Sequence, residues 1–446
     1  DIAASGCSLG SLSGSGSSYS ATCTASSDGA VTINIAANGF TDSVGNGNTV
    51  ATQYDWTYDG TAPTITTVAV AGATEDGYGV ASTYVVTITP SETLSAVPTL
   101  TVTGGSITNA GAASGDNFVY TVTPSDADEA MTVVVAAGGA ADVAGTVSAA
   151  ASNNFGWTHD ATIPTVTSIA VTDVTSGQYG NDATYTVIVT ASEALENAPT
   201  LTLAGGSVGS GTGSGGSSTT IWTYTFTPTS ADQAVTIDVA ASAITDAAGN
   251  DNTAAATQFA FTHDRTAPTA TITSTEVDTG GSNNEATTIT VTFNEEMTGI
   301  TSGDITVGDE RCTLSAFTVA TANTVFTQTC GGSGYTDGEL ITISVGVVGT
   351  DPAGNSNTAA TDFTWTYDTT APTATITSTE VNTGGSLNEA VTFTVTFSEE
   401  MTGIANGDFT VTDTRCVLSD FTVATANTVF TQICTPDTPG ELITLS

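Results

Sequence analysis

The sequence contains no lysine and only three arginines, Arg265, Arg311 and Arg415. Against them stand 45 aspartate and glutamate residues, which give a formal net charge of -42 at pH 7. A chain this acidic repels nucleic-acid phosphates and anionic membrane surfaces, and it attracts cations. We therefore expect no nucleic-acid partner. We also expect salt or a bound divalent ion wherever carboxylates gather, because their mutual repulsion disfavours compaction.

Long apolar runs are absent as well. No stretch approaches the roughly 20 apolar residues that cross a membrane, and the most apolar segment, residues 131–143, contains Asp142. We expect no membrane insertion in this segment. Residues that favour helices are scarce, whereas Thr, Val, Ser, Gly and Ala dominate, which is typical of an all-β protein. A length of 446 residues suits several domains of about 100 residues each.

The six cysteines fall into three pairs with nearly constant spacing. They are Cys7 and Cys23, Cys312 and Cys330, and Cys416 and Cys434. No Cys-x-x-Cys motif occurs and the two histidines are far from any cysteine, which argues against a zinc site. Recurrent local pairs predict disulfides inside individual domains, and hence an oxidising, extracellular location. Free buried thiols are the alternative.

One phrase recurs four times along the chain and reveals its repeats. Each copy has four consecutive positions: Trp or Phe, then Thr, then Tyr or His, then Asp. Thr-Ala-Pro-Thr or a close variant follows. The phrases begin at Trp56, Trp157, Phe261 and Trp365, and their prolines are Pro63, Pro164, Pro268 and Pro372. The spacing of about one hundred residues is the period of a seven-stranded sandwich. Proline also restricts the residue before it to extended conformations, which stiffens the connection.

We therefore predict a tandem array of seven-stranded Ig-like Greek-key β-sandwiches. Repeats 1 to 5 are predicted at residues 1–60, 61–161, 162–265, 266–369 and 370–446. Repeat 1 aligns with the C-terminal part of such a domain and repeat 5 with the N-terminal part, so we expect the sequence to be a window from a longer repetitive protein. In repeat 4, alternating residues predict strands A to G at 269–275, 286–293, 303–307, 312–320, 325–330, 339–346 and 361–368. Cys312 and Cys330 would then lie opposite each other on strands D and E.

The repeated motifs resemble those of a known family. They are Asp-x-Thr-Ala-Pro-Thr, Ser-Glu or Asn-Glu after strand B, and Asp-x-x-Gly-Asn before strand G. They are similar to tandem bacterial Ig-like domains, which occur in large surface adhesins and biofilm-associated secreted proteins. The resemblance implies a spacer or stalk at the cell surface. It also implies calcium, since acidic residues at domain junctions bind this ion in several members of the group.

The topology supports the same expectation from the residues. In a Greek-key sandwich the incoming linker, the loop between strands B and C (BC loop) and the loop between strands F and G (FG loop) meet at one end. The acidic residues and asparagines that map there are Asp59, Glu92 and Asp142 in repeat 2; Asp160, Glu193, Asp246 and Asn250 in repeat 3; Asp264, Glu295, Asp351 and Asn355 in repeat 4; and Asp368 and Glu399 in repeat 5. Repeat 1 offers only Asp42 and Asn46.

Carboxylates brought together in this way suit calcium, which takes six to eight oxygen ligands. The alternative is that Asp-x-x-Gly-Asn is only a turn, since these residues favour turns for backbone reasons. Thr146 replaces the asparagine in repeat 2, so we expect the weakest site there.

The predicted function is a structural stalk or filament segment of a large secreted surface protein, with calcium at its junctions. One alternative is a module that binds a glycan or another surface, and a second is lateral self-association into fibres, a sheath or an S-layer. We expect no enzyme activity. The glycine motifs at 205–209 and 211–216 match catalytic or nucleotide-binding patterns only in letters, because no helix follows them. His159 and His263 stand where Tyr58 and Tyr367 stand in sister repeats, which favours a structural role.

Overall fold

The computed structural model describes most of the chain. The residues outside the described set are 115, 151, 215–218, 309–311, 322, 332–333, 388, 413–414, 438–442 and 445–446. The chain divides into two units, Asp1–Thr266 and Ala267–Ser446, so repeats 1 to 3 belong to unit 1 and repeats 4 and 5 to unit 2. The regular elements of the described residues are β-strands apart from two 3-10 helices, Ser302–Asp304 and Asn406–Asp408, which confirms the all-β class. Among these residues, no helix has the length and apolar character needed to cross a membrane.

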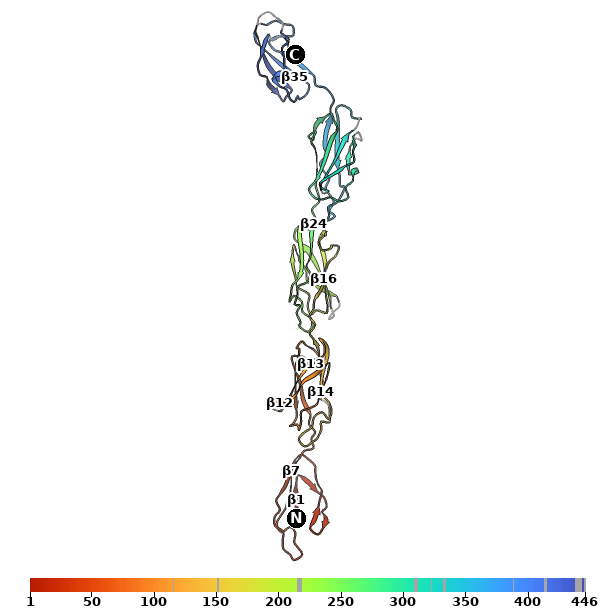
Figure 1. Cartoon of the computed structure of the whole chain (residues 1–446), viewed down its shortest axis with the longest axis vertical. Coiled ribbons are helices and arrows are strands. Elements are labelled where there is room, and N and C mark those ends of the chain that lie inside the picture. Colours follow the sequence, from red (N-terminus) through yellow and green to blue (C-terminus); the bar gives the residue numbers. More distant parts are fainter. Residues whose placement is uncertain are drawn as a thin grey trace. The chain divides into compact units, whose positions relative to one another are not determined.

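Repeat 2 is a sandwich of two four-stranded sheets (Figure 1). In the first sheet the order is β12 (Gly105–Ser114), β13 (Asn117–Pro124), β10 (Tyr84–Pro90) and β8 (Ile65–Ala71). In the second the order is β11 (Leu100–Thr103), β14 (Asp128–Val135), β15 (Phe155–Asp160) and β9 (Tyr78–Gly79). This arrangement confirms the predicted sandwich, with strand A divided between the sheets as β8 and β9.

The division of strand A was not predicted. Gly72 follows β8 with a φ of +88°, a left-handed conformation that glycine adopts readily, and there the chain leaves the first sheet. The short β9 then pairs in parallel with β15, where Tyr78 faces Thr158 and Gly79 faces His159. A two-residue strand shows no alternation of apolar residues, so the sequence pattern could not reveal it.

Repeat 3 has the same plan. The first sheet contains β16 (Val166–Val171), β18 (Tyr185–Ala191), β22 (Ile221–Pro228), β20 (Gly206–Val208) and β21 (Thr212–Ser214), the last pairing with β22. The second contains β17 (Tyr179–Gly180), β24 (Phe259–Asp264), β23 (Asp232–Val239) and β19 (Leu201–Ala204). The glycine motifs at 205–209 and 211–216 therefore lie on or beside short strands, except that residues 215 and 216 are outside the described set.

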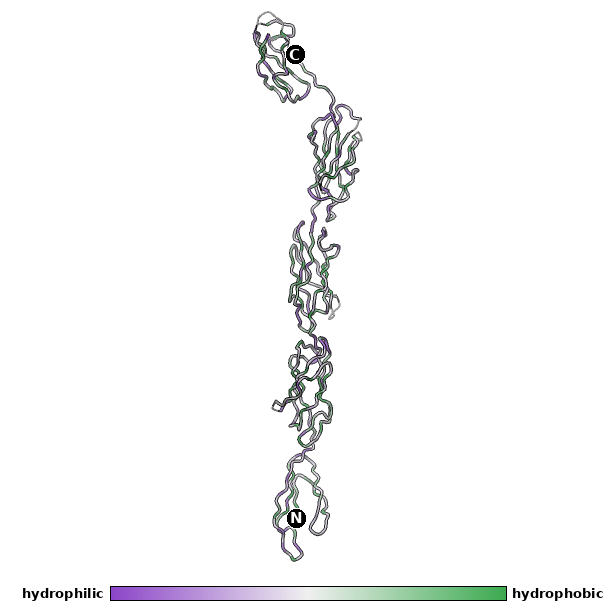
Figure 2. Tube along the Cα trace, in the orientation of Figure 1, coloured by the Kyte–Doolittle hydropathy of each residue, from purple (hydrophilic) through white to green (hydrophobic). Residues whose placement is uncertain are grey.

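The cores form between the sheets because alternate strand residues point inward. Along β18, Tyr185, Val187 and Val189 are buried while the residues between them are more exposed. Figure 2 shows the hydropathy of the residues along the whole trace. Burying one such aliphatic side chain stabilises a fold by about 1.5–3 kcal/mol. His263 is also buried, and its Nδ1 lies 2.8 Å from the hydroxyl of Tyr185. His159 and Tyr84 make the same contact at 2.7 Å in repeat 2. Both histidines are thus core residues.

Repeat 1 contains a three-stranded sheet and two short hairpins. The sheet order is β1 (Ile2–Ser5), β6 (Gly29–Ile35) and β7 (Tyr54–Tyr58). One hairpin pairs β2 (Cys7–Leu9) with β5 (Cys23–Ala25), and the other pairs β3 (Ser13–Ser15) with β4 (Ser18–Ser20). These strands correspond to the later part of repeats 2 and 3.

Repeat 4, in unit 2, again has two sheets. The first contains β25 (Ala270–Ser274), β27 (Thr287–Phe293), β31 (Val325–Gly331), β29 (Thr313–Leu314) and β30 (Thr318–Thr321). The second contains β26 (Gly281–Asn283), β33 (Phe363–Tyr367), β32 (Glu339–Val345) and β28 (Ile305–Val307). The predicted strand D at 312–320 is two strands, β29 and β30. Repeat 5 has one described sheet, formed by β34 (Ala374–Ser378), β35 (Val391–Phe397), β38 (Val429–Pro436), β36 (Cys416–Leu418) and β37 (Thr422–Thr425).

All six cysteines form disulfides in the predicted pairs. The Cα atoms are 5.6 Å apart in Cys7–Cys23, 5.4 Å in Cys312–Cys330 and 5.5 Å in Cys416–Cys434. Each bond crosses diagonally between neighbouring antiparallel segments, with Cys312 lying directly before β29. The residue directly opposite the second cysteine is a leucine two positions after the first: Leu9, Leu314 or Leu418. The expectation of directly opposed cysteines was therefore wrong by two residues.

Candidate cation site

The linker aspartates are fixed by local hydrogen bonds. Asp160 is the last residue of β15, and its Oδ1 accepts a hydrogen bond from the backbone N–H of Thr162 at 3.2 Å. Asp59 directly follows β7 and accepts one from the N–H of Thr61, also at 3.2 Å. Such short-range bonds are typical of aspartate in turns. Both carboxylates are thereby held at the point where one repeat ends and the next begins.

The FG-loop aspartates sit in tight turns that also bury them. Oδ1 of Asp246 accepts hydrogen bonds from the N–H groups of Ala248, Gly249 and Asn250, at 2.9, 2.8 and 2.9 Å. In repeat 2, Oδ1 of Asp142 accepts one from the N–H of Thr146 at 2.8 Å. Both aspartates are only 1% exposed. The turn interpretation accounts for both oxygens of Asp246, since Oδ2 accepts a hydrogen bond from Nδ2 of Asn250 at 2.9 Å. In Asp142 it accounts for Oδ1 alone, and it gives no reason to bury Oδ2.

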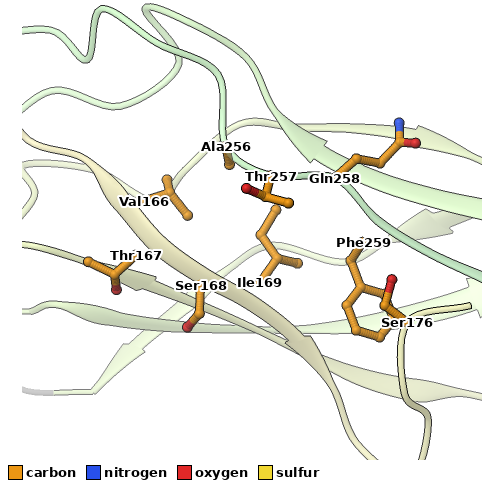
Figure 3. Close-up of a pocket in the computed structure, with 9 residues that line it drawn as sticks. All are labelled: Val166, Thr167, Ser168, Ile169, Ser176, Ala256, Thr257, Gln258 and Phe259. Carbon is orange, nitrogen blue, oxygen red and sulfur yellow. The ribbon is translucent and has the colours of Figure 1, made fainter.

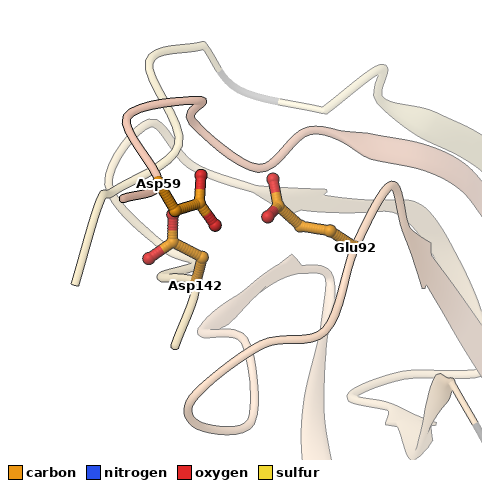
Figure 4. Close-up of side chains that lie close together, drawn as sticks. All are labelled: Asp59, Glu92 and Asp142. Atoms are coloured by element: carbon orange, nitrogen blue, oxygen red, sulfur yellow. The ribbon is translucent and has the colours of Figure 1, made fainter. Parts of the chain in front are cut away.

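Two groups of three carboxylates form where the sequence predicts them. We call Asp59, Glu92 and Asp142 site A, and Asp160, Glu193 and Asp246 site B. In each site, oxygen atoms of all three side chains lie within 4.8 Å of one another. Figure 4 shows the side chains of site A converging from the linker, the BC loop and the FG loop. These residues come from segments far apart in sequence, so only the folded repeat assembles them.

The electrostatic cost of these groups is visible in their pKa values. Burial, reinforced by the nearby Asp160, Asp246 and Asp128, raises the pKa of Glu193 to about 7. Burial and the charge of Asp246 also raise the pKa of Asp160. In site A, burial followed by the charges of Asp59, Asp142 and Asp28 raises the pKa of Glu92. Negative charge is thus disfavoured in both sites unless a positive charge is added.

The remaining donors fit a hard divalent cation. Oδ2 of Asp142 in site A and Oε1 of Glu193 in site B are buried and accept no hydrogen bond. A buried carboxylate oxygen without a partner is costly, and a cation is one of the few groups that can satisfy it. An all-oxygen donor set of carboxylates and nearby backbone carbonyls is what calcium prefers. The donor chemistry of both sites therefore fits calcium.

The other predicted ligands divide between the units. Glu295 and Asp351 lie in unit 2, with carboxylate oxygens within 4.8 Å of each other, and Asp351 is 2% exposed. Asp264 ends β24 in unit 1, so its membership of this set stays a prediction. Asp368 follows β33 and Glu399 follows β35. Within the described part of the chain, neither belongs to a group of three acidic residues of this kind.

A second set of aspartates, which the sequence reasoning missed, holds the linkers. Asp28, Asp128, Asp232 and Asp337 each accept a hydrogen bond from the hydroxyl of the linker threonine, which is Thr61, Thr162, Thr266 or Thr370 respectively. Both oxygens of Asp128 lie 2.8 Å from Oγ1 of Thr162. The available signal was an aspartate at or just before strand F in repeats 1 to 4, 33 or 34 residues before the linker threonine.

Repeat 3 also contains a shallow groove. It has a volume of about 230 Å³ and lies between β16 and the segment that leads into β24 (Figure 3). Val166 and Ile169 line it from one side, with Thr257, Gln258 and Phe259 from the other. Phe259 is the only aromatic residue in this lining and is itself 8% exposed. The groove thus offers no aromatic platform for a sugar ring.

The fold and the junction sites define a class of tandem β-sandwich repeats that share linker, BC-loop and FG-loop acids. Comparison with known families then identifies the family to which these repeats belong. The family model described as "Bacterial Ig-like domain" matches residues 160–263, 264–367 and 368–445. The chain belongs to this family of bacterial Ig-like domains. No curated protein sequence matches it significantly.

Two solved structures with low similarity were also found. The extracellular region of plexin A4 aligns with 67% of this chain and 43% of its own, at 9% identity and a TM-score of 0.20. Domains 4–9 of the surface layer protein SbsC align with 88% of this chain and 61% of their own, at 11% identity and a TM-score of 0.18. The alignments thus span less than two thirds of either structure, and at these TM-scores we draw no conclusion from them.

Proposed function

We propose that the chain is a stalk or filament segment of a large secreted, adhesin-type surface protein, and that calcium at the repeat junctions stiffens it. The observation that carries the proposal is the assembly of sites A and B, each with a buried carboxylate oxygen that has no hydrogen-bond partner. Repulsion among three acids would push the linker away from the loops. A divalent ion reverses this force and ties the three segments together.

Each residue of a site has a distinct role in this account. In site B, Asp160 supplies a ligand from the linker, Glu193 from the BC loop and Asp246 from the FG loop. Calcium supplies the positive charge that offsets the three carboxylates. Because Asp160 belongs to the end of β15, fixing it to the loops of the next sandwich limits motion between repeats 2 and 3. Binding to the folded state alone also raises stability by mass action, about 2.7 kcal/mol at 100 times the Kd.

Two further features support an extracellular location. The three disulfides require an oxidising compartment to form and persist. Calcium is also far more abundant outside cells than inside, in keeping with the weak sites of extracellular modules.

The alternatives from the sequence have less support. The groove in repeat 3 gives little support to a glycan ligand, because its aliphatic and small polar lining is unlike a surface on which sugar rings stack. Lateral self-association into fibres or an S-layer would use exposed sheet edges such as β12 or β11. No contact of the described residues bears on that possibility, so it stays a prediction.

Small-angle scattering of the full chain, first with calcium and then with excess chelator, tests the proposal. We expect the maximum dimension and the stiffness to change on chelation and to return when calcium is restored. A variant with Asp142→Asn and Asp246→Asn, which keeps the shape of both side chains, should give the chelated profile in either condition. The same wild-type scattering profile with calcium and with chelator would contradict the proposal.

A further inference from the structure

The FG loops differ at one position that faces the buried aspartate. In repeats 1, 3 and 4 an asparagine side chain donates from Nδ2 to Oδ2 of the loop aspartate at 2.9 Å, in the pairs Asn46–Asp42, Asn250–Asp246 and Asn355–Asp351. In repeat 2 this position is Thr146, which has no amide group. Oδ2 of Asp142 accordingly has no partner, although Asp142 is 99% buried.

Asn250 makes a second contact that crosses the junction. Its Nδ2 also donates to the backbone carbonyl of Asp160 at 3.0 Å. One amide group thus joins the FG loop to the linker, which is the same connection that the proposed cation makes. The donor side of the amide, rather than its oxygen, faces the carboxylates. Asn250 is therefore an uncharged side chain that links the FG loop to the linker by hydrogen bonds within site B.

We propose that the residue at this position sets how strongly each junction depends on calcium. Site A, with Thr146, relies on the ion to satisfy Asp142 and to hold the linker. Site B keeps part of that connection through Asn250 when calcium is removed. The inference rests on the proposed function, since it assigns a ranking to the same two sites.

This ranking differs from the expectation drawn from the sequence. There the asparagine counted as an additional oxygen ligand, which made repeat 2 the weakest candidate. The structure uses the amide as a hydrogen-bond donor that already satisfies Oδ2 of Asp246. The carboxylate that still lacks a partner on its second oxygen is Asp142. Chelation should consequently loosen the junction at site A before the junction at site B.

Reciprocal substitutions in the full chain test the ranking. Hydrogen exchange of the linker amides of Thr61 and Thr162 would be followed by mass spectrometry, with calcium and with chelator. In the wild type we expect chelation to accelerate exchange at Thr61 roughly tenfold more than at Thr162, the scale of one lost hydrogen bond to a charged group. Thr146→Asn should reduce the response at Thr61, and Asn250→Thr should raise the response at Thr162 to that of Thr61.

The control is Asn46→Thr, which makes the same change in the FG loop of repeat 1. Asp42 is exposed there and belongs to no described group of three acids, so calcium should not alter its effect. If neither reciprocal variant changes the response of its junction while calorimetry with calcium alone still shows binding, the ranking is wrong. If calorimetry shows no binding in any variant, the proposed function itself fails. The two failures are therefore distinguishable.

Discussion

Repeats 3 and 4 fill the same layer of their cores in different ways. In repeat 3 the first residue of strand B is Tyr185, which lies opposite Phe226 on strand E. The ring of Tyr185 packs edge-on against His263 with centroids 5.7 Å apart, and its hydroxyl contacts that histidine. Aromatic rings and one hydrogen bond therefore close this end of the sandwich.

Repeat 4 has small residues and a disulfide in the corresponding places. Thr287 begins strand B and lies opposite Cys330, which is bonded to Cys312. Tyr367, at the position of His263, stacks on Tyr335 with ring centroids 4.5 Å apart. The covalent bond and the stacked pair occupy the layer that Tyr185 and Phe226 fill in repeat 3.

The comparison separates the variable end of the sandwich from the constant one. At the opposite end, Glu193 and Asp246 of repeat 3 correspond to Glu295 and Asp351 of repeat 4, and both pairs bring carboxylate oxygens close together. Packing can be solved in several ways, so the residues that serve it change between repeats. Packing alone does not explain why acids that repel each other recur at this end, and their recurrence supports the proposed cation.

The largest expected effect is on the aromatic packing in the core of repeat 3. Tyr185→Ala should destabilise repeat 3 by about 3–5 kcal/mol, because it leaves a cavity beside Phe226 and removes the partner of His263. Urea titration followed by hydrogen exchange of peptides from each repeat would measure this. Tyr179→Ala, which removes a tyrosine that is 45% exposed in the same repeat, is the control and should cost little. Equal losses for the two variants would contradict the assigned role of Tyr185.

Reduction of the disulfide should destabilise repeat 4. Cys312 and Cys330 are 18 residues apart in sequence, and their bond restricts the unfolded chain. Breaking it, or replacing both residues by alanine, should lower the unfolding free energy of repeat 4 by about 3 kcal/mol. Repeat 3 contains no cysteine, so its exchange pattern under the same reductant serves as the internal control. The interpretation fails if reduction loosens repeats 3 and 4 to the same extent, or neither of them.

A pH dependence should distinguish the acidic end from the variable one. The pKa of Glu193 is about 7 in the folded protein and 4.5 without its surroundings, so the folded state binds the proton more tightly. In chelator, repeat 3 should therefore gain stability as the pH falls from about 7 towards 4.5, by about 1–2 kcal/mol after allowance for solvent screening.

Glu193→Gln is the variant that isolates this effect. Its unfolding free energy should be less dependent on pH than that of the wild type over the same interval, as measured by urea titration at each pH. Calcium should also bind the wild type less tightly below pH 7, because protons compete for Glu193. Parallel pH profiles of variant and wild type would show that Glu193 is not protonated in the folded state near neutral pH.

The smallest expected effect concerns the aspartates that hold the linkers in both kinds of repeat. Thr162→Val removes the hydroxyl that Asp128 accepts and keeps the side-chain shape, so it should cost about 1 kcal/mol or less. Thr370→Val makes the same change at Asp337. Both should raise exchange of the linker amides locally without changing the core strands. Loss of core protection in either variant would show that these bonds do more than position the linker.

Much of this architecture could be predicted from the sequence, for identifiable reasons. The alternation in residues 288–293 marked strand B of repeat 4, and the recurring Trp-Thr-Tyr-Asp phrase marked its last strand. The Greek-key path brings the linker, BC and FG loops together, so the sequence alone groups Asp160, Glu193 and Asp246.

Other features depend on contacts that leave no periodic pattern. The parallel pairing of β9 with β15 involves two residues, and the bond between Asp128 and Thr162 joins positions that only the tertiary fold brings together. The burial of His263 beside Tyr185 could not be predicted either. A histidine at a position that holds tyrosine in sister repeats gives no sign of whether the side chain is buried. The direction of the Asn250 amide could not be inferred without the carbonyl of Asp160 beside it.

Isothermal titration of calcium into the full chain tests the central claim most directly. The account predicts saturable binding for the wild type, loss of one binding event in Asp142→Asn, loss of a different one in Asp246→Asn, and loss of both in the double variant. The matched substitution Asp76→Asn, at an acid outside the two sites, should leave the titration unchanged. Absence of binding in the wild type, or an unchanged stoichiometry in the double variant, would contradict the assignment of sites A and B.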